Sequence, residues 1–294
     1  MINNLKPKGL AISMIIEAES ANYGEGVGNV ASLKKMSRGK GNQYTYISRQ
    51  ALRYNIGEQL GEKYAPVKAE GSGEKKVIQF DESATIDEYP EIDFFGYLKT
   101  EKGTGGKKRS AKIRISNAIS LETFKGDLDF LTNKGLADRL KDDMNIAQAE
   151  IHRSYYRYTI VADLDQIGID EEYSIELPNS EKTRRVKKLL DTVAFLYRDI
   201  RGRREDLKPL FAIGGVYDIK NPVFQNVVDI KDNRILVNQI QGVLYDNIAK
   251  DTYCGLVEGK FDNDNEIKSK LKSLSMPEFF NKLKAKVDDY YEGN

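Results

Sequence analysis

The stretch KGLAISMIIEA at 8–18 is apolar on both of its alternating faces. At the two-residue period of a β-strand, one face carries Leu10, Ile12 and Met14, and the other carries Ile15. A strand of this kind must be covered on both sides, so it predicts the central first strand of a sheet between two layers. A chain of 294 residues, of which 40% are hydrophobic, is long enough to supply those layers.

The elements that follow alternate between helix and strand. SRQALRYNIGEQL predicts a helix with Ser48 as its N-cap, and strands are expected at 155–164 and 210–217, with a helix between them that begins after Ser180 and ends at about residue 199. This order is typical of a split βαβ arrangement. We therefore predict an α+β fold with the ferredoxin-like sheet of RNA-recognition-motif (RRM) domains, and expect its missing second strand inside 64–150.

Three further segments complete the expected organisation. The stretch 64–150 is rich in glycine and lysine and contains only short apolar pieces, which indicates an inserted domain of hairpins without a core of its own. The stretch 218–242 alternates apolar and polar residues around a turn at 231–233, which predicts an exposed hairpin arm. The S-x-x-E pattern at Ser275 is a capping box and predicts a last helix, packed on the sheet.

Composition excludes several classes of protein. A single cysteine, Cys254, cannot form an internal disulfide, and with a single histidine, His152, there is no Cys/His set for structural zinc. No apolar run approaches the ~18 residues that span a bilayer, and the first residues lack a signal-peptide pattern, so we expect a cytoplasmic protein without membrane contact. The glycines at 24–28 do not have dinucleotide-binding spacing, and no metal or cofactor is expected.

Charge is balanced overall, with 46 Lys plus Arg against 45 Asp plus Glu, but it is unevenly distributed. Between positions 27 and 57 there are six basic residues and no acid, and tyrosines are interleaved among the basic residues. Such an array of basic residues can bind the phosphates along a nucleic-acid strand, while the aromatic rings offer stacking surfaces for bases. The basic residues are Lys34, Lys35, Arg38, Lys40, Arg49 and Arg53, and the tyrosines are Tyr44, Tyr46 and Tyr54.

Two more basic clusters occur, at 99–114 and at 182–204. Each cluster taken alone is equally compatible with a solvated face, whereas the three together favour nucleic acid. The acids of 81–93 are segregated in the same way, in a stretch without a basic residue. A protein with separate positive and negative faces can stack head-to-tail on copies of itself.

His152 is the only imidazole available as a general base near neutral pH. One hypothesis is therefore a metal-independent endoribonuclease in which this side chain takes the proton of a 2′-hydroxyl. The alternative is a structural histidine, because the sequence displays no catalytic partners for it. Cys254 is interpreted as a small core residue.

Three segments together resemble one family: LKPKGLAISMIIEAESANYGEGVGNVASLKKM at 5–36, QYTYISRQALRYNI at 43–56, and DFFGYL at 93–98. The sequence resembles the backbone subunit of type I CRISPR Cascade complexes, in the DevR branch typical of subtype I-B. The resemblance implies a hand-shaped fold, with an RRM-like palm at 1–63 and 151–294 and an inserted finger domain at 64–150. It also implies a thumb, for which the hairpin at 218–242 is the candidate, with Pro222, Val223, Phe224 and Gln225.

The same resemblance implies a function. Several copies would form a helical filament along the spacer of the guide RNA (crRNA), beside other Cascade subunits, and present the guide bases for pairing with target DNA in antiviral defence. Type III relatives cut RNA with an aspartate, which 27–57 lacks, so we expect no catalysis. The endoribonuclease using His152 is the alternative.

By position, the resemblance assigns guide contacts to Asn22, Asn29, Ser48, Arg49, Gln50 and Arg53, with Lys34 and Lys35 nearby. The basic clusters add Arg38, Lys107 and Lys108. A structural interpretation is open for three of these residues: Asn22 and Asn29 can shape the loop, and Ser48 can act only as a helix cap.

Overall fold

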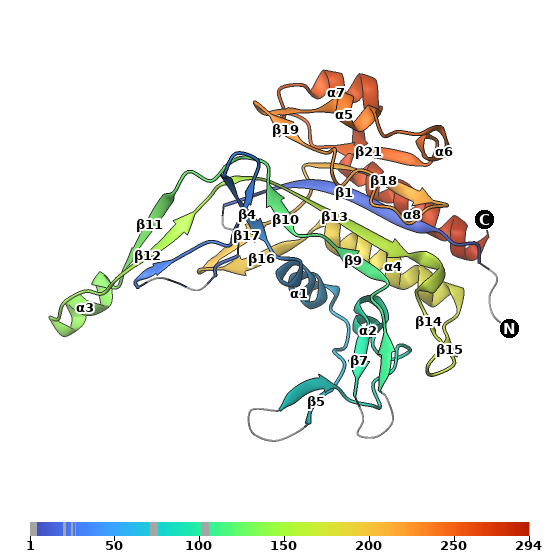
Figure 1. The fold of residues 1–294 in the computed structure, drawn as a ribbon, viewed down its shortest axis with the longest axis horizontal. Coiled ribbons are helices and arrows are strands. Elements are labelled where there is room, and N and C mark those ends of the chain that lie inside the picture. The colour runs from blue at the N-terminus through green and yellow to red at the C-terminus, as the bar shows by residue number, and fades with distance from the viewer. Residues whose placement is uncertain are drawn as a thin grey trace.

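The computed structural model describes residues 5–19, 22–24, 26, 28–70, 76–100 and 106–293. Its centre is a nine-stranded sheet with the order β22-β21-β18-β1-β13-β10-β4-β3, in which β9 also pairs with β13 (Figure 1). Its strands are β1 (Gly9–Ala18), β3 (Lys35–Arg38), β4 (Asn42–Ile47), β9 (Ile113–Ile115), β10 (Ala118–Ser120), β13 (Ser154–Asp163), β18 (Phe211–Tyr217), β21 (Thr252–Leu256) and β22 (Leu274–Ser275).

The first strand occupies the middle of this sheet. β1 pairs antiparallel with both β13 and β18, and all of its residues except the half-buried Glu17 are buried. Leu10, Ile12 and Met14 belong to one core and Ala11 and Ile15 to a second, on the opposite face. The prediction of a central strand covered on both sides is confirmed.

Three helices cover the first face of the sheet: α1 (Arg49–Leu60), α4 (Asn179–Ala194) and α8 (Met276–Glu292). Ser48 caps α1 and Ser275 makes the capping box of α8, both as predicted. The predicted end of α4 at residue 199 is wrong, because the helix stops at Ala194 and the chain turns into a hairpin at Arg201 and Gly202, which have positive φ. That hairpin is β16 (Tyr197–Ile200) and β17 (Arg203–Asp206).

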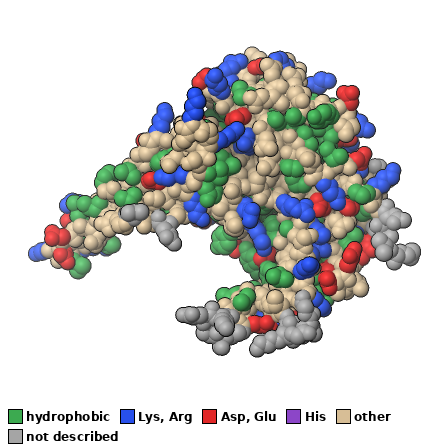
Figure 2. Space-filling model, viewed as in Figure 1, with side chains coloured by type: hydrophobic (Ala, Val, Ile, Leu, Met, Phe, Trp, Pro, Cys, Tyr) green, Lys and Arg blue, Asp and Glu red, His purple; other side chains and the backbone are tan. Residues whose placement is uncertain are grey.

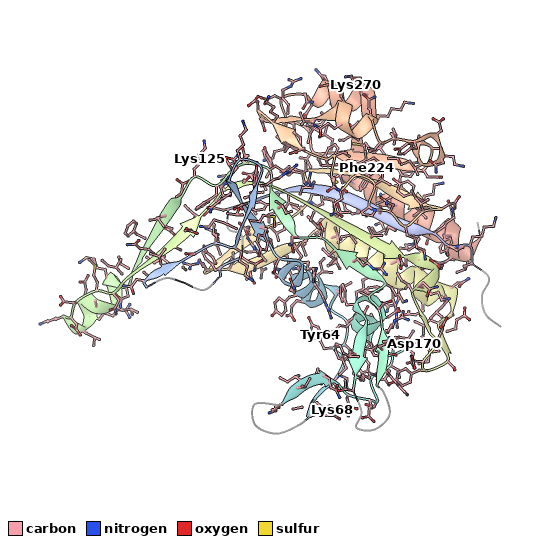
Figure 3. All side chains as sticks on the ribbon, viewed as in Figure 1. Tyr64, Lys68, Lys125, Asp170, Phe224 and Lys270 are labelled. Carbon is pink, nitrogen blue, oxygen red and sulfur yellow. The ribbon has the colours of Figure 1, made fainter. Side chains whose placement is uncertain are left out.

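Residues 218–251 and 257–271, on either side of β21, cover the second face of the sheet, and this corrects the expected hairpin arm at 218–242. The turn lies where it was predicted, but the strands on either side have only two residues. Phe224 is buried against the sheet (Figure 3). Val228 belongs to the same core, and Pro222, Val223 and Gln225 are half-buried. An exposed arm here would leave the apolar second face of β1 bare. The layer contains β19 (Ile230–Lys231), β20 (Arg234–Ile235), α5 (Val237–Gln241), α6 (Asp246–Ala249) and α7 (Asp264–Leu271).

Two projections leave the sheet (Figure 1). The first, at 64–112, we call the finger; its small core of Ala84, Ile86 and Ile92 contradicts the expectation that this stretch lacks a core. The finger consists of β5 (Val67–Glu70), β6 (Val77–Phe80), α2 (Pro90–Phe95), β7 (Tyr97–Lys99) and β8 (Lys107–Arg109).

The second projection, at 127–151, we call the arm. It consists of β11 (Asp127–Thr132), α3 (Lys134–Leu140) and β12 (Ile146–Ile151), with β2 (Val30–Ala31) paired to β12. Between finger and arm, β9 and β10 return to the sheet beside β13, so 64–112 and 127–151 are separate projections. A short 3-10 turn, η2 (Leu164–Gln166), and the hairpin of β14 (Ile169–Asp170) and β15 (Ile175–Glu176) complete the fold. Within the described ranges, no helix is both long and apolar enough to cross a bilayer.

Candidate nucleic-acid interface

The first turn of α1 borders a groove of about 310 Å³ between this helix, the finger and β9. Arg49 and Gln50 are exposed at its edge, Arg53 is half-buried one turn further along the helix, and Arg114 approaches from β9. Phe95, from α2 of the finger, closes the groove. We call this site the α1 groove. Figure 2 shows the face of the molecule on which the arm and finger flank a hollow.

Electrostatics in the α1 groove favour an anion. No acid occupies the first turn of α1, so the partial positive charge of the helix N-terminus adds to that of the arginines. The Arg53 guanidinium lies 4.6 Å from the centre of the Phe95 ring and 3.8 Å from a Glu91 carboxylate oxygen. Burial lowers the pKa of Arg53 and Glu91 opposes that effect. Arg114 donates to Asp163 over 2.9 Å and keeps about half of its side chain exposed.

Asn22 and Ser48 have structural roles in the free protein. The Asn22 side-chain oxygen accepts a hydrogen bond from the Ser48 backbone N–H, and the Ser48 hydroxyl accepts one from the Ala51 N–H over 3.3 Å. The side-chain oxygen of Asn117 accepts the Arg49 N–H over 2.9 Å. These bonds set where α1 begins and hence where its arginines project. RNA contacts by Asn22 and Ser48 stay a prediction.

The basic stretch before α1 is not a continuous loop, because much of it is the β3–β4 hairpin. Across the hairpin Lys35 pairs with Thr45 and Met36 with Tyr44, so the two strand faces are distinct. Arg38 shares the face of Met36 and Tyr44. On the other face, the Lys35 ammonium is 2.7 Å from Glu150 and 4.4 Å from the centre of the Phe124 ring.

Lys34 and Asn29 lie away from the α1 groove. Lys34 is exposed just before β3, and its backbone bonds to Asn22 and Tyr46. Asn29 lies beside the arm, where its carbonyl accepts from the Gln148 N–H over 3.0 Å. The structure therefore brings Arg49, Gln50 and Arg53 together but places Lys35 in an ion pair and Asn29 next to β12.

The two other basic clusters do not form continuous surfaces. In the cluster at 99–114, Lys99 and Arg109 are buried inside the finger, whereas Lys107 and Lys108 are exposed on β8. The Lys107 ammonium lies 4.0 Å from the centre of the Tyr173 ring. The inference that three clusters favour nucleic acid thus rests on fewer residues than expected.

In the cluster at 182–204, the positive charges mostly serve the fold. Lys182, Arg185 and Arg198 are buried, and Arg184 and Lys188 both pair with Glu62 at 2.7 Å. Two of their acidic partners, Glu62 and Asp93, are distant in sequence, so the run of like charges gave no sign of them.

His152 is buried and serves as a packing residue. Its Nδ1 lies 2.7 Å from the Thr45 hydroxyl, and its ring packs edge-on against Phe124 and Tyr156. Burial lowers the pKa of His152. Because a general base must reach its substrate, this environment does not favour the endoribonuclease hypothesis. In the described part of the chain, no three His, Cys, Asp or Glu side chains are grouped to hold a metal ion.

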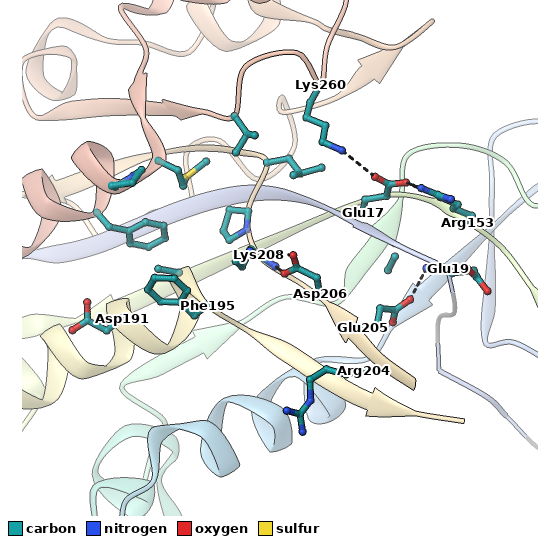
Figure 4. A pocket seen from close by; sticks show the side chains of 18 of the residues that line it. Glu17, Glu19, Arg153, Asp191, Phe195, Arg204, Glu205, Asp206, Lys208 and Lys260 are labelled. Atoms are coloured by element: carbon teal, nitrogen blue, oxygen red, sulfur yellow. Dashed lines mark hydrogen bonds and ion pairs between the residues drawn. The ribbon is translucent and has the colours of Figure 1, made fainter. Parts of the chain in front are cut away.

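A larger hollow, of about 780 Å³, shares no residue with the α1 groove (Figure 4). It lies between the end of α4, β17 and the start of α8, with Phe195, Met276 and Phe280 among its apolar lining. Most of the charged side chains at its rim pair with each other, as Arg153 does with Glu17 and Lys284 with Asp191. This internal neutralisation makes it less suited to a polyanion than the α1 groove is.

Sequence reasoning missed three residues of the interface. Arg114 was seen only as part of a charge cluster, because nothing local shows that β9 lies beside α1. Asn117 carries no sequence signal for its bond to the Arg49 backbone. Glu91 belongs to an acidic stretch and gave no sign that it pairs with Arg53 from another domain.

Comparisons with known proteins agree with this architecture. Residues 10–237 match the family described as CRISPR-associated negative auto-regulator DevR/Csa2. A chain of a "CRISPR RNA-guided surveillance complex, pre-nicking" superposes with a TM-score of 0.60 at 12% identity, covering 94% of this chain and 99% of that one. A chain of a "CRISPR RNA-guided surveillance complex" gives a TM-score of 0.55 at 16% identity, over 94% and 98%. No curated protein sequence matches. At these identities, the two structures show a shared fold.

Proposed function

This chain belongs to the CRISPR-associated DevR/Csa2 family, and from that premise we propose that it is the multi-copy subunit of a Cascade-like complex that binds the guide RNA backbone. The observation that carries the proposal is the α1 groove. Arg49 and Arg53 are four residues apart on one side of a helix whose first turn has no acid, and Arg114 is opposite them. Cations at a helix N-terminus bind phosphates without reading bases, as a subunit that must bind guide RNAs of any sequence requires.

The strand order supports an RRM-like palm. β1, the β9/β10 segment, β13 and β18 would be its four strands, and they lie in the sheet in the order β18, β1, β13, β10. α1 and α4, which follow the first and third of these strands, pack on the same face. This is the βαββαβ order of RRM domains with the finger and the arm inserted before and after the second strand.

The arm is the better candidate for the thumb. It is a long two-stranded ribbon that projects from the body (Figure 1), and Leu128, Phe130, Leu136 and Leu140 are exposed on it. A ribbon with this much exposed apolar surface gains stability by packing on another molecule. We propose that arms of successive copies contact their neighbours head-to-tail along the guide, whose bases stay available to target DNA, and that other Cascade subunits close the ends.

The test is RNA binding by an Arg49→Glu/Arg53→Glu variant, measured by fluorescence anisotropy with two RNAs of unrelated sequence. Binding should weaken about equally for both RNAs. The plot of the logarithm of the association constant against the logarithm of the salt concentration should become shallower by about 1.4, the effect of losing two phosphate contacts at about 0.7 each on a single strand. Lys187→Glu/Lys284→Glu, which changes the net charge equally on α4 and α8 outside the groove, is the control. A loss confined to one RNA, or an equal loss in the control, would contradict the proposal.

A second measurement addresses assembly. Protein purified without nuclease treatment should carry short RNA, seen as excess absorbance at 260 nm, and should elute as a multi-copy species whose size falls when the RNA is digested. Protein that stays free of RNA and monomeric in the presence of a guide transcript would argue against a guide-bound filament.

A further inference from the structure

Asp93, the first residue of DFFGYL, is a fully buried carboxylate at the junction of the finger with the body. One of its oxygens lies 2.7 Å from the Arg109 guanidinium and the other 3.0 Å from that of Arg185. The Gly168 N–H donates to both oxygens, over 2.9 and 3.1 Å. Asp93 thus links α2 of the finger to β8, to α4 and to the loop after η2.

Each of the two arginines also donates hydrogen bonds to groups other than Asp93. Arg109 also donates to the carbonyls of Gln166 and Ile169, while Arg185 donates to the Ile86 carbonyl and to Glu181. Both guanidiniums are almost completely buried. Charge-assisted bonds that share one buried carboxylate allow little rotation of α2, because any movement would leave a buried charge unpaired.

α2 also supplies one wall of the α1 groove. Glu91, two residues before Asp93, is the carboxylate 3.8 Å from Arg53, and Phe95, two residues after it, is the ring under the same guanidinium. Gly96 then has a φ of 74°, and a Cβ there would clash with the backbone carbonyl oxygen of Arg109. The chain therefore leaves α2 in close contact with the strand that carries Arg109.

We infer that Asp93 is a positioning residue of the RNA interface: it holds α2 so that the Phe95 ring orients the Arg53 guanidinium toward the groove. This inference rests on the proposed function. It assigns the DFFGYL segment a role that goes beyond packing, because Asp93 acts on RNA affinity through Arg53, a residue that it does not touch.

The test is a double-mutant cycle in the full-length protein with Arg53→Ala and Asp93→Asn, read out as affinity for a guide-length RNA. We expect Arg53→Ala to cost about tenfold in the otherwise native protein, the loss of one charge-assisted hydrogen bond. In the Asp93→Asn background the same change should cost at most about twofold, because Arg53 is then no longer oriented. The control is Glu205→Gln, which breaks the buried ion pair with Arg198, 2.6 Å apart on the β16–β17 hairpin.

The outcomes separate the inference from the proposed function. A tenfold effect of Arg53→Ala in both backgrounds overturns the positioning role and leaves the RNA-binding proposal in place. No effect of Arg53→Ala in the native background overturns both. Strong coupling of Arg53 to Glu205 as well would show a general loss of rigidity, and it too overturns a specific role for Asp93.

A spectroscopic measurement makes the test independent of RNA. The Arg53 guanidinium carbon lies over the Phe95 ring, 4.6 Å from its centre, so the ring current should shift the NMR signal of the Arg53 Nε–H proton upfield. Asp93→Asn should move the signal toward the position of a freely solvated arginine, and Glu205→Gln should leave it unchanged. If Asp93→Asn is not recovered folded, Arg109→Lys, which keeps a positive charge beside Asp93 but loses the bonds of the guanidinium, takes its place in both experiments. If the Arg53 signal in that variant stays at its native upfield position, the inference is overturned.

Discussion

Glu91 competes with nucleic acid for Arg53, and replacing it should tighten RNA binding. The guanidinium and the carboxylate are 3.8 Å apart, with 42% and 21% of their side chains exposed. For a pair this exposed, solvent screening limits the interaction to about 0.2–1 kcal/mol. Arg53 must give up that energy when it turns to a phosphate, so Glu91→Gln should raise RNA affinity by about 1.4- to 5-fold. Glutamine keeps an oxygen that can accept the Ala65 N–H, as Glu91 does over 3.4 Å.

The assay is a binding titration of Glu91→Gln against Glu88→Gln, in the same salt and with the same RNA. Glu88 lies 3.7 Å from Lys63, so its replacement changes the net charge equally and breaks a similar pair, but neither partner lines the α1 groove. The difference between the variants should shrink as salt rises, because the Debye length falls to about 8 Å at 0.15 M ionic strength. Equal affinities of the two variants at low salt would refute the competition between Glu91 and RNA.

Three further predictions concern pH and assembly. Hydrogen bonds from Arg184 and Arg185 lower the pKa of Glu181 to about 2, so the ionised carboxylate stabilises the folded state. In urea unfolding, Glu181→Gln should therefore lower the free energy of unfolding by its full amount above pH 4.5, and the difference from the native protein should vanish as the pH falls toward 2. Burial lowers the pKa of His152, so its imidazole NMR signals should titrate below pH 6.5. Because protonation of His152 favours the unfolded state, the His152→Gln variant should lose less stability than the native protein as the pH falls below 6.5. Phe130→Ser/Leu140→Ser, on the exposed arm, should shorten the guide-bound assembly in native mass spectrometry and leave the RNA affinity of a single copy unchanged.

The elements predicted correctly from the sequence are those with a complete local signal. β1 is apolar on both faces, and α1 and α8 begin at serine caps, so each is determined by residues within a few positions. The end of α4 was misplaced because Tyr197 and Ile200 continue the helical period by chance. A left-handed turn at Arg201 and Gly202 allows a hairpin there instead.

Alternation alone did not distinguish an exposed hairpin from a covering layer. The segment 218–242 and the arm both contain alternating apolar residues and turns, yet Phe224 is buried and Phe130 is 61% exposed. The difference lies in the partner: the second face of the sheet needed a cover, and the segment after β18 leaves the sheet beside that face. Which segment packs on which surface depends on the topology of the whole chain, and it cannot be predicted from the local sequence of either segment.

The same limit explains which basic residues of the candidate site were recognised. Arg49 was singled out because no acid occurs in 27–57, and among the described residues it has no ion-pair partner. Arg185, in an equally basic run, is neutralised by Glu181 four residues before it and by Asp93 from the finger. A positive run therefore indicates a polyanion only where both the local sequence and the folded neighbours leave it uncompensated. In this chain that condition holds at the start of α1, where Glu91 is the one acid in the described part of the chain that lies within ion-pair distance of the groove arginine Arg53. This is why Glu91 is the carboxylate whose removal should strengthen RNA binding.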